Sequence, residues 1–236
     1  MLSHTDQIVL DAATDVAARL VDGETHTVAA SAIDLSGRVH SAANVFHFTG
    51  APCAELAVLG AAAAVSDDPV MTIVAVGNDG RGVLAPCGRC RQVLLDLHPH
   101  ALVLVPGDDG VVAVPVRELL PGAYAWGDAP APRVVRFADR HRDAVLAGRK
   151  TATVRFRDPQ GTGPTTFVFE DDRSARFATV PAVVESVVTK RVADLDTADV
   201  LAEGLGSVDE LGAGLQRHYP AITADDVVQV ARFRLG

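Results

Sequence analysis

All three cysteines of the chain lie in two short segments, and each segment begins just after a proline. Cys53 precedes Glu55 by two residues, and Cys87 and Cys90 form a Cys-x-x-Cys pair. Thiolates bind zinc well, and three protein ligands leave a fourth position for water, as in catalytic zinc sites. A carboxylate beside the ligands can carry a proton to or from that water. The pattern therefore predicts a zinc-dependent hydrolytic site.

The surrounding sequence predicts that both cysteine segments begin helices. Residues 53–65 and 87–97 are apolar or amphipathic runs opened by a proline, which is favoured in the first turn of a helix. The partial positive charge of a helix N-terminus favours thiolates, so we expect it to act on all three cysteines. Arg89 and Arg91 are close enough in the sequence to offset the excess negative charge of three thiolates on one divalent ion.

Two other interpretations of the cysteines remain open. Cys87 and Cys90 alone are typical of a thioredoxin-like redox pair, but that interpretation leaves Cys53 and Glu55 without a role. A closed structural zinc site would need a fourth ligand, for which His47 is the candidate. Zinc content measured together with hydrolytic activity separates the three interpretations.

The arrangement of a ligand, a glutamate two residues later and Pro-Cys-x-x-Cys matches the signature of zinc nucleobase deaminases. The segments NVFHFTGAPCAELAVLG and RGVLAPCGRCRQVLLDLHP resemble the cytidine deaminase family, and within it the blasticidin S deaminases. The resemblance covers about residues 5–128. It implies an α-β-α sandwich, a homotetramer, one zinc per subunit held by Cys53, Cys87 and Cys90, and hydrolytic deamination at carbon 4 of a cytosine ring. It also implies that Glu55 is the proton shuttle.

The same resemblance bears on the substrate. Cytidine deaminases of the ordinary type hold the ribose hydroxyls with the Asn and Glu of an N-x-E-N motif, whereas here Asn44 is kept and Phe46 replaces the carboxylate. The loss of a charge-assisted contact favours a modified sugar or a larger cytosine derivative over plain cytidine, and leaves cytidine, deoxycytidine and blasticidin S as candidates. The expected substrate-binding residues are Asn44, Phe46, Arg89, Tyr124 and Trp126. Packing is the alternative role for Tyr124 and Trp126.

A second resemblance covers about residues 133–235. The segments LAGRKTATVRF and LAEGLGSVDELGAGLQRHYP resemble the ASCH domain family, which implies a small α+β, PUA-like β-barrel. Some members hydrolyse the amide of N4-acetylcytidine, and the corresponding catalytic residues here are Lys150, Thr153 and Glu203. RNA binding is the alternative, since the run from Arg133 to Arg157 is basic. The domain is nonetheless neutral overall and contains few aromatic side chains on which bases would stack.

The sequence thus predicts two domains, residues 1–128 and 133–236, joined by a proline-rich linker at 129–132. The first is expected to be an α/β sandwich of order α-β-β-α-β-α-β-β, and the second a small α+β unit. Their expected elements are helices at 6–20, 53–65, 87–97 and 139–147, one from a Ser207–Glu210 capping box to about His218, and strands at 27–34, 38–46, 71–77, 101–105, 110–115, 133–137, 150–156, 165–170, 178–189 and 227–235.

Charge and hydropathy narrow the functional classes. Residues 1–128 carry 6 basic and 15 acidic side chains, a balance of 6 − 15 = −9, which argues against binding to duplex DNA. No apolar run approaches the ~18 residues of a membrane span, and the acidic N-terminus is unlike a signal peptide. We expect a cytoplasmic protein that has no membrane partner.

Overall fold

The computed structural model describes residues 2–20, 23–124, 126–127, 131–171, 174 and 176–236. The chain divides into two compact units, and each is considered by itself. The first comprises residues 1–132 and 170–177, and the second comprises residues 133–169 and 178–236. Of the predicted linker, residues 129 and 130 lie outside the described residues, so the predicted domain boundaries stay predictions.

The first unit is built on a mixed sheet of strand order β2-β1-β3-β5-β6. Strand β4 pairs with the C-terminal part of β3. Only the β3–β5 pair is parallel among the pairings of this sheet. Its elements are α1 (His4–Ala17), β1 (Val28–Asp34), β2 (Val39–Ala43), α2 (Ala54–Ala63), β3 (Val70–Gly77), β4 (Gly82–Leu84), α3 (Gly88–Leu97), β5 (Leu102–Gly107), β6 (Gly110–Pro115) and the 3-10 turn η1 (Val116–Leu119).

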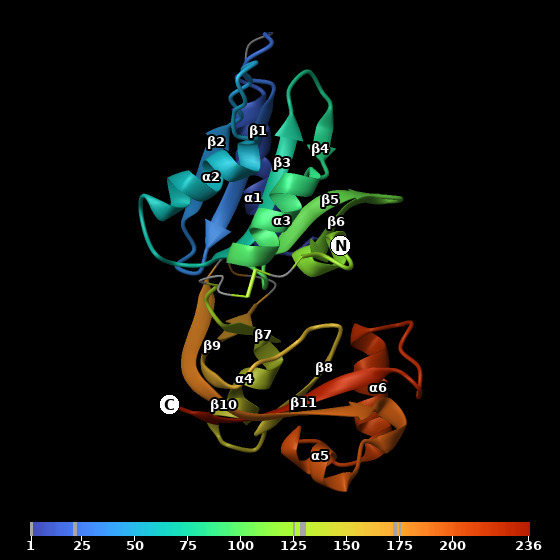
Figure 1. The fold of residues 1–236 in the computed structure, drawn as a ribbon. Coiled ribbons are helices and arrows are strands. Elements are labelled where there is room, and N and C mark those ends of the chain that lie inside the picture. Colours follow the sequence, from blue (N-terminus) through green and yellow to red (C-terminus); the bar gives the residue numbers. More distant parts are fainter. Residues whose placement is uncertain (1, 21–22, 125, 128–130, 172–173, 175) are drawn as a thin grey trace. The chain divides into compact units, whose positions relative to one another are not determined.

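Helices cover both faces of this sheet, which confirms the predicted α-β-α sandwich. Figure 1 shows α2 and α3 in front of the strands and α1 behind them. The central strand β3 is buried along its whole length, as its continuous apolar run predicts. Helix α2, before β3, and helix α3, after β4, lie on the same face of the sheet. Their N-termini lie close together.

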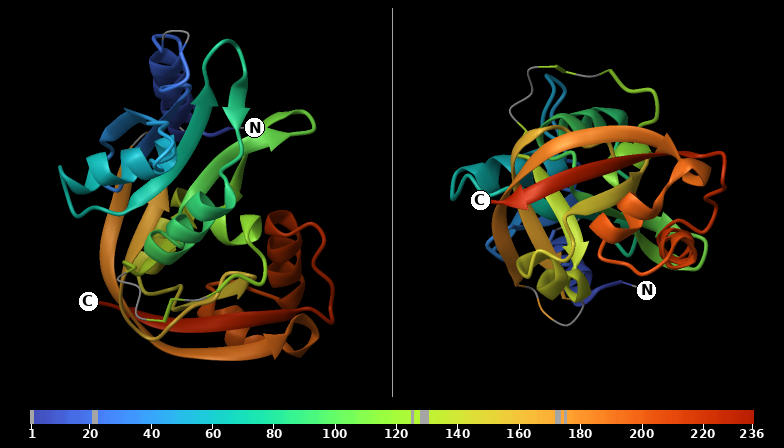
Figure 2. Two further views of the ribbon diagram at one scale, coloured as in Figure 1. Left: turned by 45° about the horizontal axis from the view of Figure 1, so that its top comes forward. Right: turned by 90° about the horizontal axis from the view of Figure 1, so that it is seen from below.

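The second unit is a five-stranded sheet of order β7-β9-β10-β11-β8 that curls into a half-barrel. Figure 2 shows the long strands β10 and β11 curving together. This agrees with the predicted small α+β unit. Its elements are β7 (Val134–Ala138), η2 (Asp139–His141), α4 (Arg142–Leu146), β8 (Ala152–Phe156), β9 (Gly163–Glu170), β10 (Phe177–Arg191), η3 (Val192–Asp194), α5 (Thr197–Ala202), α6 (Val208–His218) and β11 (Val227–Leu235).

Two apolar clusters fill the second unit. One is aliphatic and lies under α5 and α6. The other is aromatic: the ring centroids of Phe167 and Phe233 are 4.6 Å apart and edge-on, and Phe137 stacks on Phe169 at 5.5 Å. Such ring pairs add to the stabilisation that burial itself provides. Phe167 is completely buried, so this cluster is the centre of one side of the half-barrel.

The sequence-based expectations differ from the structure in several details. The helix expected at 139–147 is divided into η2 and the short α4, and the strand expected at 38–46 ends at Ala43. Strand β4 and helix α5 were not predicted, because a three-residue strand and a six-residue helix are too short to show a period. The predicted capping box at α6 is half formed: Ser207 Oγ accepts from the Glu210 N–H, but the Glu210 carboxylate accepts from Gly206 instead of Ser207.

None of the helices in the described part of the chain combines the length and apolarity that a membrane crossing requires.

The aromatic cluster predicts the effect of a cavity in the second unit. Phe167→Ala should lower the free energy of unfolding of this unit by about 3–5 kcal/mol, the usual cost of deleting a buried phenylalanine ring. Urea titration followed by hydrogen exchange in the peptides of β9 and β11 measures it. Leu201→Ala is the control, because this side chain is 65% exposed and its loss should change stability by about 0.5 kcal/mol or less. Equal effects of the two substitutions would contradict the packing described.

Candidate functional site

The three cysteine thiols converge at the edge of the first unit where α2 and α3 begin. The Sγ atoms of Cys53 and Cys87 are 3.8 Å apart, and those of Cys87 and Cys90 are 3.5 Å apart. All three sulfurs lie within 4.8 Å of one another and form the one group of potential metal ligands found among the described residues. The structure therefore brings together residues that are up to 37 positions apart, 90 − 53, in the sequence.

The two helix starts place these thiols. Cys53 is the N-cap residue of α2 and Cys87 that of α3, and neither side chain caps its own helix with a hydrogen bond. Cys90 lies in the first turn of α3 and is completely buried. The backbone N–H groups of Arg89 and Cys90 donate to the Cys87 sulfur, as expected where a helix presents its unpaired N–H groups.

The pKa values of the three thiols are shifted in different directions in the metal-free cluster. Burial raises the pKa of Cys53, and burial together with the nearby Glu55 raises that of Cys90. Burial also opposes ionisation of Cys87, but hydrogen bonds from Cys90, Cys53 and Arg89 outweigh it and lower the pKa of Cys87. In the metal-free cluster, burial therefore outweighs the helix N-terminus at Cys53 and Cys90 but not at Cys87. The expectation of three thiolates concerns the metal-bound site and stays a prediction.

Two residues beside the cluster have clear positions. Glu55 lies in the first turn of α2, and only 6% of its surface is exposed. The guanidinium of Arg91 donates to the carbonyl oxygens of Pro86, at 2.7 Å, and Leu119, at 2.9 Å. Arg91 therefore fixes the loop before Cys87, and sequence spacing alone did not reveal this role. His47 is outside the group of potential ligands and bonds to Thr49 Oγ1 instead.

The expected substrate-binding residues of the first unit lie in the loop after β2, at the start of α3 and in the segment after η1. Asn44 follows β2, and its Oδ1 accepts from the N–H groups of Thr27 and Val28, so its amide nitrogen has a fixed direction. Phe46 is 59% exposed. The side chains of Arg89, Tyr124 and Trp126 are also exposed, and the Tyr124 carbonyl is tied to α3 through Gln92 Nε2 at 2.9 Å. The roles of these five residues in binding stay predictions.

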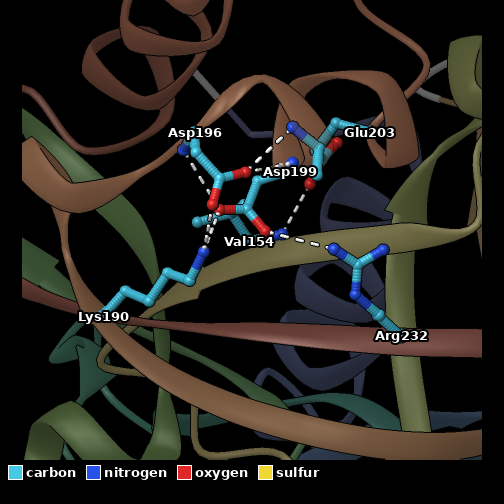
Figure 3. Close-up of polar contacts among 7 residues, drawn as sticks. Val154, Lys190, Asp196, Asp199, Glu203 and Arg232 are labelled. Atoms are coloured by element: carbon cyan, nitrogen blue, oxygen red, sulfur yellow. Dashed lines mark hydrogen bonds and ion pairs between the residues drawn. The ribbon is translucent and has the colours of Figure 1, made fainter.

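A second group of polar residues lies inside the second unit. Lys150, just before β8, is 3% exposed, and its Nζ forms an ion pair with the carboxylate of Glu203 at the end of α5. Glu203 also accepts from the backbone N–H of Val154 (Figure 3). Burial lowers the pKa of Lys150, Glu203 acts in the opposite direction, and Arg155 adds to the lowering. The structure thus joins two of the three residues that the sequence singled out in this unit.

The third residue, Thr153, lies beside this pair. It is buried, and its Oγ1 accepts from Arg155 Nε at 3.1 Å. Arg155 in turn lies over the ring of Phe137, with its Cζ atom 5.0 Å from the ring centroid, and Lys150 Nζ is 5.9 Å from the same centroid. Such stacking suits a desolvated cation. Arg155 was not among the predicted site residues, although it lies only two positions after Thr153.

Two histidines next to this group also escaped the sequence analysis. Burial, with help from Lys150 and Arg140, lowers the pKa of His141 to about 4. Burial and Arg140 likewise lower that of His218, whose Nε2 lies 2.7 Å from an Arg140 nitrogen. An arginine can only donate, so His218 is neutral and accepts. Lone histidines in unrelated segments give no sequence signal of such a meeting.

Comparison with known proteins places the first unit. No protein-family model matches the chain. A cytidine deaminase from Mycobacterium tuberculosis is 38% identical over 109 residues, 45% of this chain and 78% of that protein. A blasticidin-S deaminase from Bacillus cereus is 28% identical over 132 residues, 52% of this chain and 94% of that protein. Among solved structures, an ASCH domain from Lactobacillus crispatus aligns with 44% of this chain and 79% of its own length, at 14% identity and a TM-score of 0.35. Because of its 38% identity to the cytidine deaminase from Mycobacterium tuberculosis, the chain belongs to the cytidine deaminase family.

Proposed function

We propose that the first unit is a zinc-dependent hydrolase that deaminates a cytosine nucleoside or a modified form of one. The observation that carries the proposal is the meeting of three thiols within 4.8 Å beside the buried carboxylate of Glu55. A set of three sulfur donors fits a tetrahedral soft-ligand site with one open position. Cys53, Cys87 and Cys90 would hold the ion, which supplies the chemistry of activating a water molecule for attack on the ring.

The chain's own residues supply the remaining steps. Glu55 takes one proton from the attacking water and passes it to the ring nitrogen. It then takes the second proton of that water, from the hydroxyl group now on carbon 4, and passes it to the exocyclic amine, which leaves as ammonia while the carbonyl forms. Its buried position beside the thiols keeps the carboxylate away from bulk water. Asn44 offers its amide nitrogen to the sugar, because its oxygen is already held by two backbone N–H groups. Phe46 contacts the sugar or its substituent through apolar surface in place of a carboxylate.

The expected homotetramer and cytoplasmic location are further parts of this proposal. Exposed apolar side chains in the loop after β2, at Val45, Phe46 and Phe48, support association of first units with one another.

The role of Glu55 leads to a test of deamination. Glu55→Gln keeps the shape of the side chain but removes its proton transfer, so kcat for uridine formation from cytidine or for deamination of blasticidin S should fall by about 10²–10⁴-fold. Bound zinc, measured by mass spectrometry of the metal, should stay at one per chain. Glu118→Gln is the matched control, because Glu118 is an exposed residue of η1, and it should leave both values unchanged. A metal-free protein that cycles a Cys87–Cys90 disulfide would instead support the redox interpretation.

The position of Phe46 leads to a test of substrate choice. Phe46→Glu restores a charged acceptor for the ribose hydroxyls, and hydrogen bonds to charged groups contribute about 1.5–3 kcal/mol. We expect kcat/KM for cytidine to rise by about 10-fold or more relative to that for blasticidin S. Phe48→Glu is the control, because it adds the same charge two residues away on a side chain that is 89% exposed. If both variants change the ratio equally, Phe46 does not contact the sugar.

For the second unit we propose hydrolysis of an acyl group from the exocyclic nitrogen of cytosine. The observation that favours it is the buried Lys150–Glu203 pair, since a desolvated lysine with a lowered pKa can serve as base or nucleophile. Glu203 orients the amine, and Thr153 and Arg155 lie beside it. The product, a free cytosine amine, is the group that the first unit would then remove. RNA binding without hydrolysis is the alternative.

A variant that lacks deamination reveals this first step. Glu55→Ala should accumulate cytidine from N4-acetylcytidine, whereas the unmodified protein should release uridine, as measured by mass-resolved chromatography. Adding Lys150→Gln to Glu55→Ala should abolish cytidine formation, whereas adding Arg149→Gln, a neighbouring exposed cation, should not. Unchanged N4-acetylcytidine with Glu55→Ala, together with salt-dependent retention on RNA, would favour the binding alternative.

A further inference from the structure

The carboxylate of Asp199 is a buried charge that has no part in the chemistry proposed above. Only 1% of the residue is exposed, yet it meets cations from two strands. Lys190 Nζ, from β10, is 2.6 Å from its Oδ2, and Arg232 Nη2, from β11, is 3.3 Å from its Oδ1. Figure 3 shows Asp199 between these two side chains. Burying a carboxylate is costly unless it is paired in this way.

Asp199 is also part of the first turn of α5. Its Oδ2 accepts from the Asp196 N–H at 3.2 Å, and Asp196 Oδ1 accepts from Ala198 and Asp199, so the two aspartates form a capping box. Lys190 bonds to Asp196 as well, at 2.9 Å. A helix of six residues has little stability of its own. Its position therefore depends on these anchors to β10 and β11.

The other end of the same helix carries Glu203. The Glu203 N–H donates to the Asp199 carbonyl oxygen at 2.9 Å, so a single helical turn joins the anchored carboxylate to the one that meets Lys150. Beyond it, Gly204 has a φ of +76°, and a Cβ there would lie 3.0 Å from the Arg149 carbonyl oxygen. The Thr151 N–H donates to Ala202 O at 2.7 Å. The end of α5 thus fits closely against the segment that contains Lys150.

We propose that Asp199 is a positioning residue, which fixes α5 through Lys190 and Arg232 so that Glu203 stays against Lys150. Its importance for catalysis rests on the proposed amide hydrolysis in this unit, but the contact that it maintains can be measured without any activity. A purely stabilising ion-pair cluster would differ in one respect: its loss would lower stability and leave the surroundings of Lys150 in the folded protein unchanged.

The small number of lysines provides a direct measurement. Lys150 and Lys190 are the only lysines in the sequence, so protein labelled with [¹³Cε]lysine gives two lysine signals, which Lys190→Arg assigns. The charged and titratable groups facing Lys150 are Glu203, Arg155, His141 and His218. Of these, only Glu203 raises the pKa of Lys150. Displacement of Glu203 must therefore lower the titration midpoint of Lys150.

Asp199→Asn should lower that midpoint in the folded protein, in the same direction as Glu203→Gln, which serves as the reference. Asp194→Asn is the matched control, because Asp194 is exposed and, among the described residues, forms an ion pair with Arg191 only. In Asp199→Asn we also expect kcat for N4-acetylcytidine hydrolysis to fall by about 10²-fold with KM nearly unchanged, since the substrate still binds while the base is misplaced.

The outcomes separate the two proposals. If Asp199→Asn folds and Lys150 titrates as in the unmodified protein, the positioning role is overturned. If Asp199→Asn does not fold, Arg232→Gln, which leaves Lys190 in place, should give a smaller shift in the same direction, and an unchanged Lys150 midpoint in that variant overturns the role. If the midpoint shifts while the unmodified protein hydrolyses no acylated cytidine, the positioning role stands and the proposed hydrolysis fails.

Discussion

Three thiols so close together cannot all lose their protons unless a cation replaces those protons. Much of the structure of the first unit serves to hold these three thiols next to one another. The sulfurs lie within 4.8 Å of one another, although burial raises the pKa of both Cys53 and Cys90. The crowding is unfavourable for three bare thiolates and favourable for a divalent ion that binds sulfur. Glu55 adds to this effect, because its carboxylate raises the pKa of Cys53 and Cys90. The proposed role of Glu55 as proton shuttle accounts for a carboxylate at this position.

The fold meets this requirement with few elements. Strand β3 lies at the buried centre of the sheet. Helices α2 and α3, before and after it in the sequence, lie on the same face and begin close together. Each cysteine segment is therefore fixed by a helix N-terminus. Arg91 donates to the carbonyl oxygen of Pro86, in the loop between β4 and α3, and to that of Leu119 at the end of η1. In the second unit, too, a helix positions a side chain of the site. A six-residue helix held by Asp199 at its start carries Glu203 at its end.

Much of this arrangement could be predicted from the sequence. The long apolar or amphipathic segments predicted both helices of the thiol cluster, the buried strand β3 and the terminal strand β11 at nearly their observed limits, because burial dominates such segments. The residue spacing singled out Cys53, Glu55, Cys87 and Cys90 together. The remaining contacts depend on tertiary structure. No local pattern shows that Arg91 binds carbonyl oxygens, that burial outweighs the helix N-terminus at Cys90, or that Lys190 and Arg232 meet at Asp199.

X-ray absorption spectroscopy at the zinc K-edge of the purified protein tests the central claim most directly, because it reports the ligands and not merely the presence of metal. The account predicts about one zinc per chain, with three sulfur neighbours at about 2.3 Å and one lighter neighbour at about 2.0 Å. Four protein ligands with a histidine nitrogen in the fourth position would indicate a closed structural site. Protein that contains no zinc after purification without chelators, and takes up none when zinc is added, would contradict the account altogether.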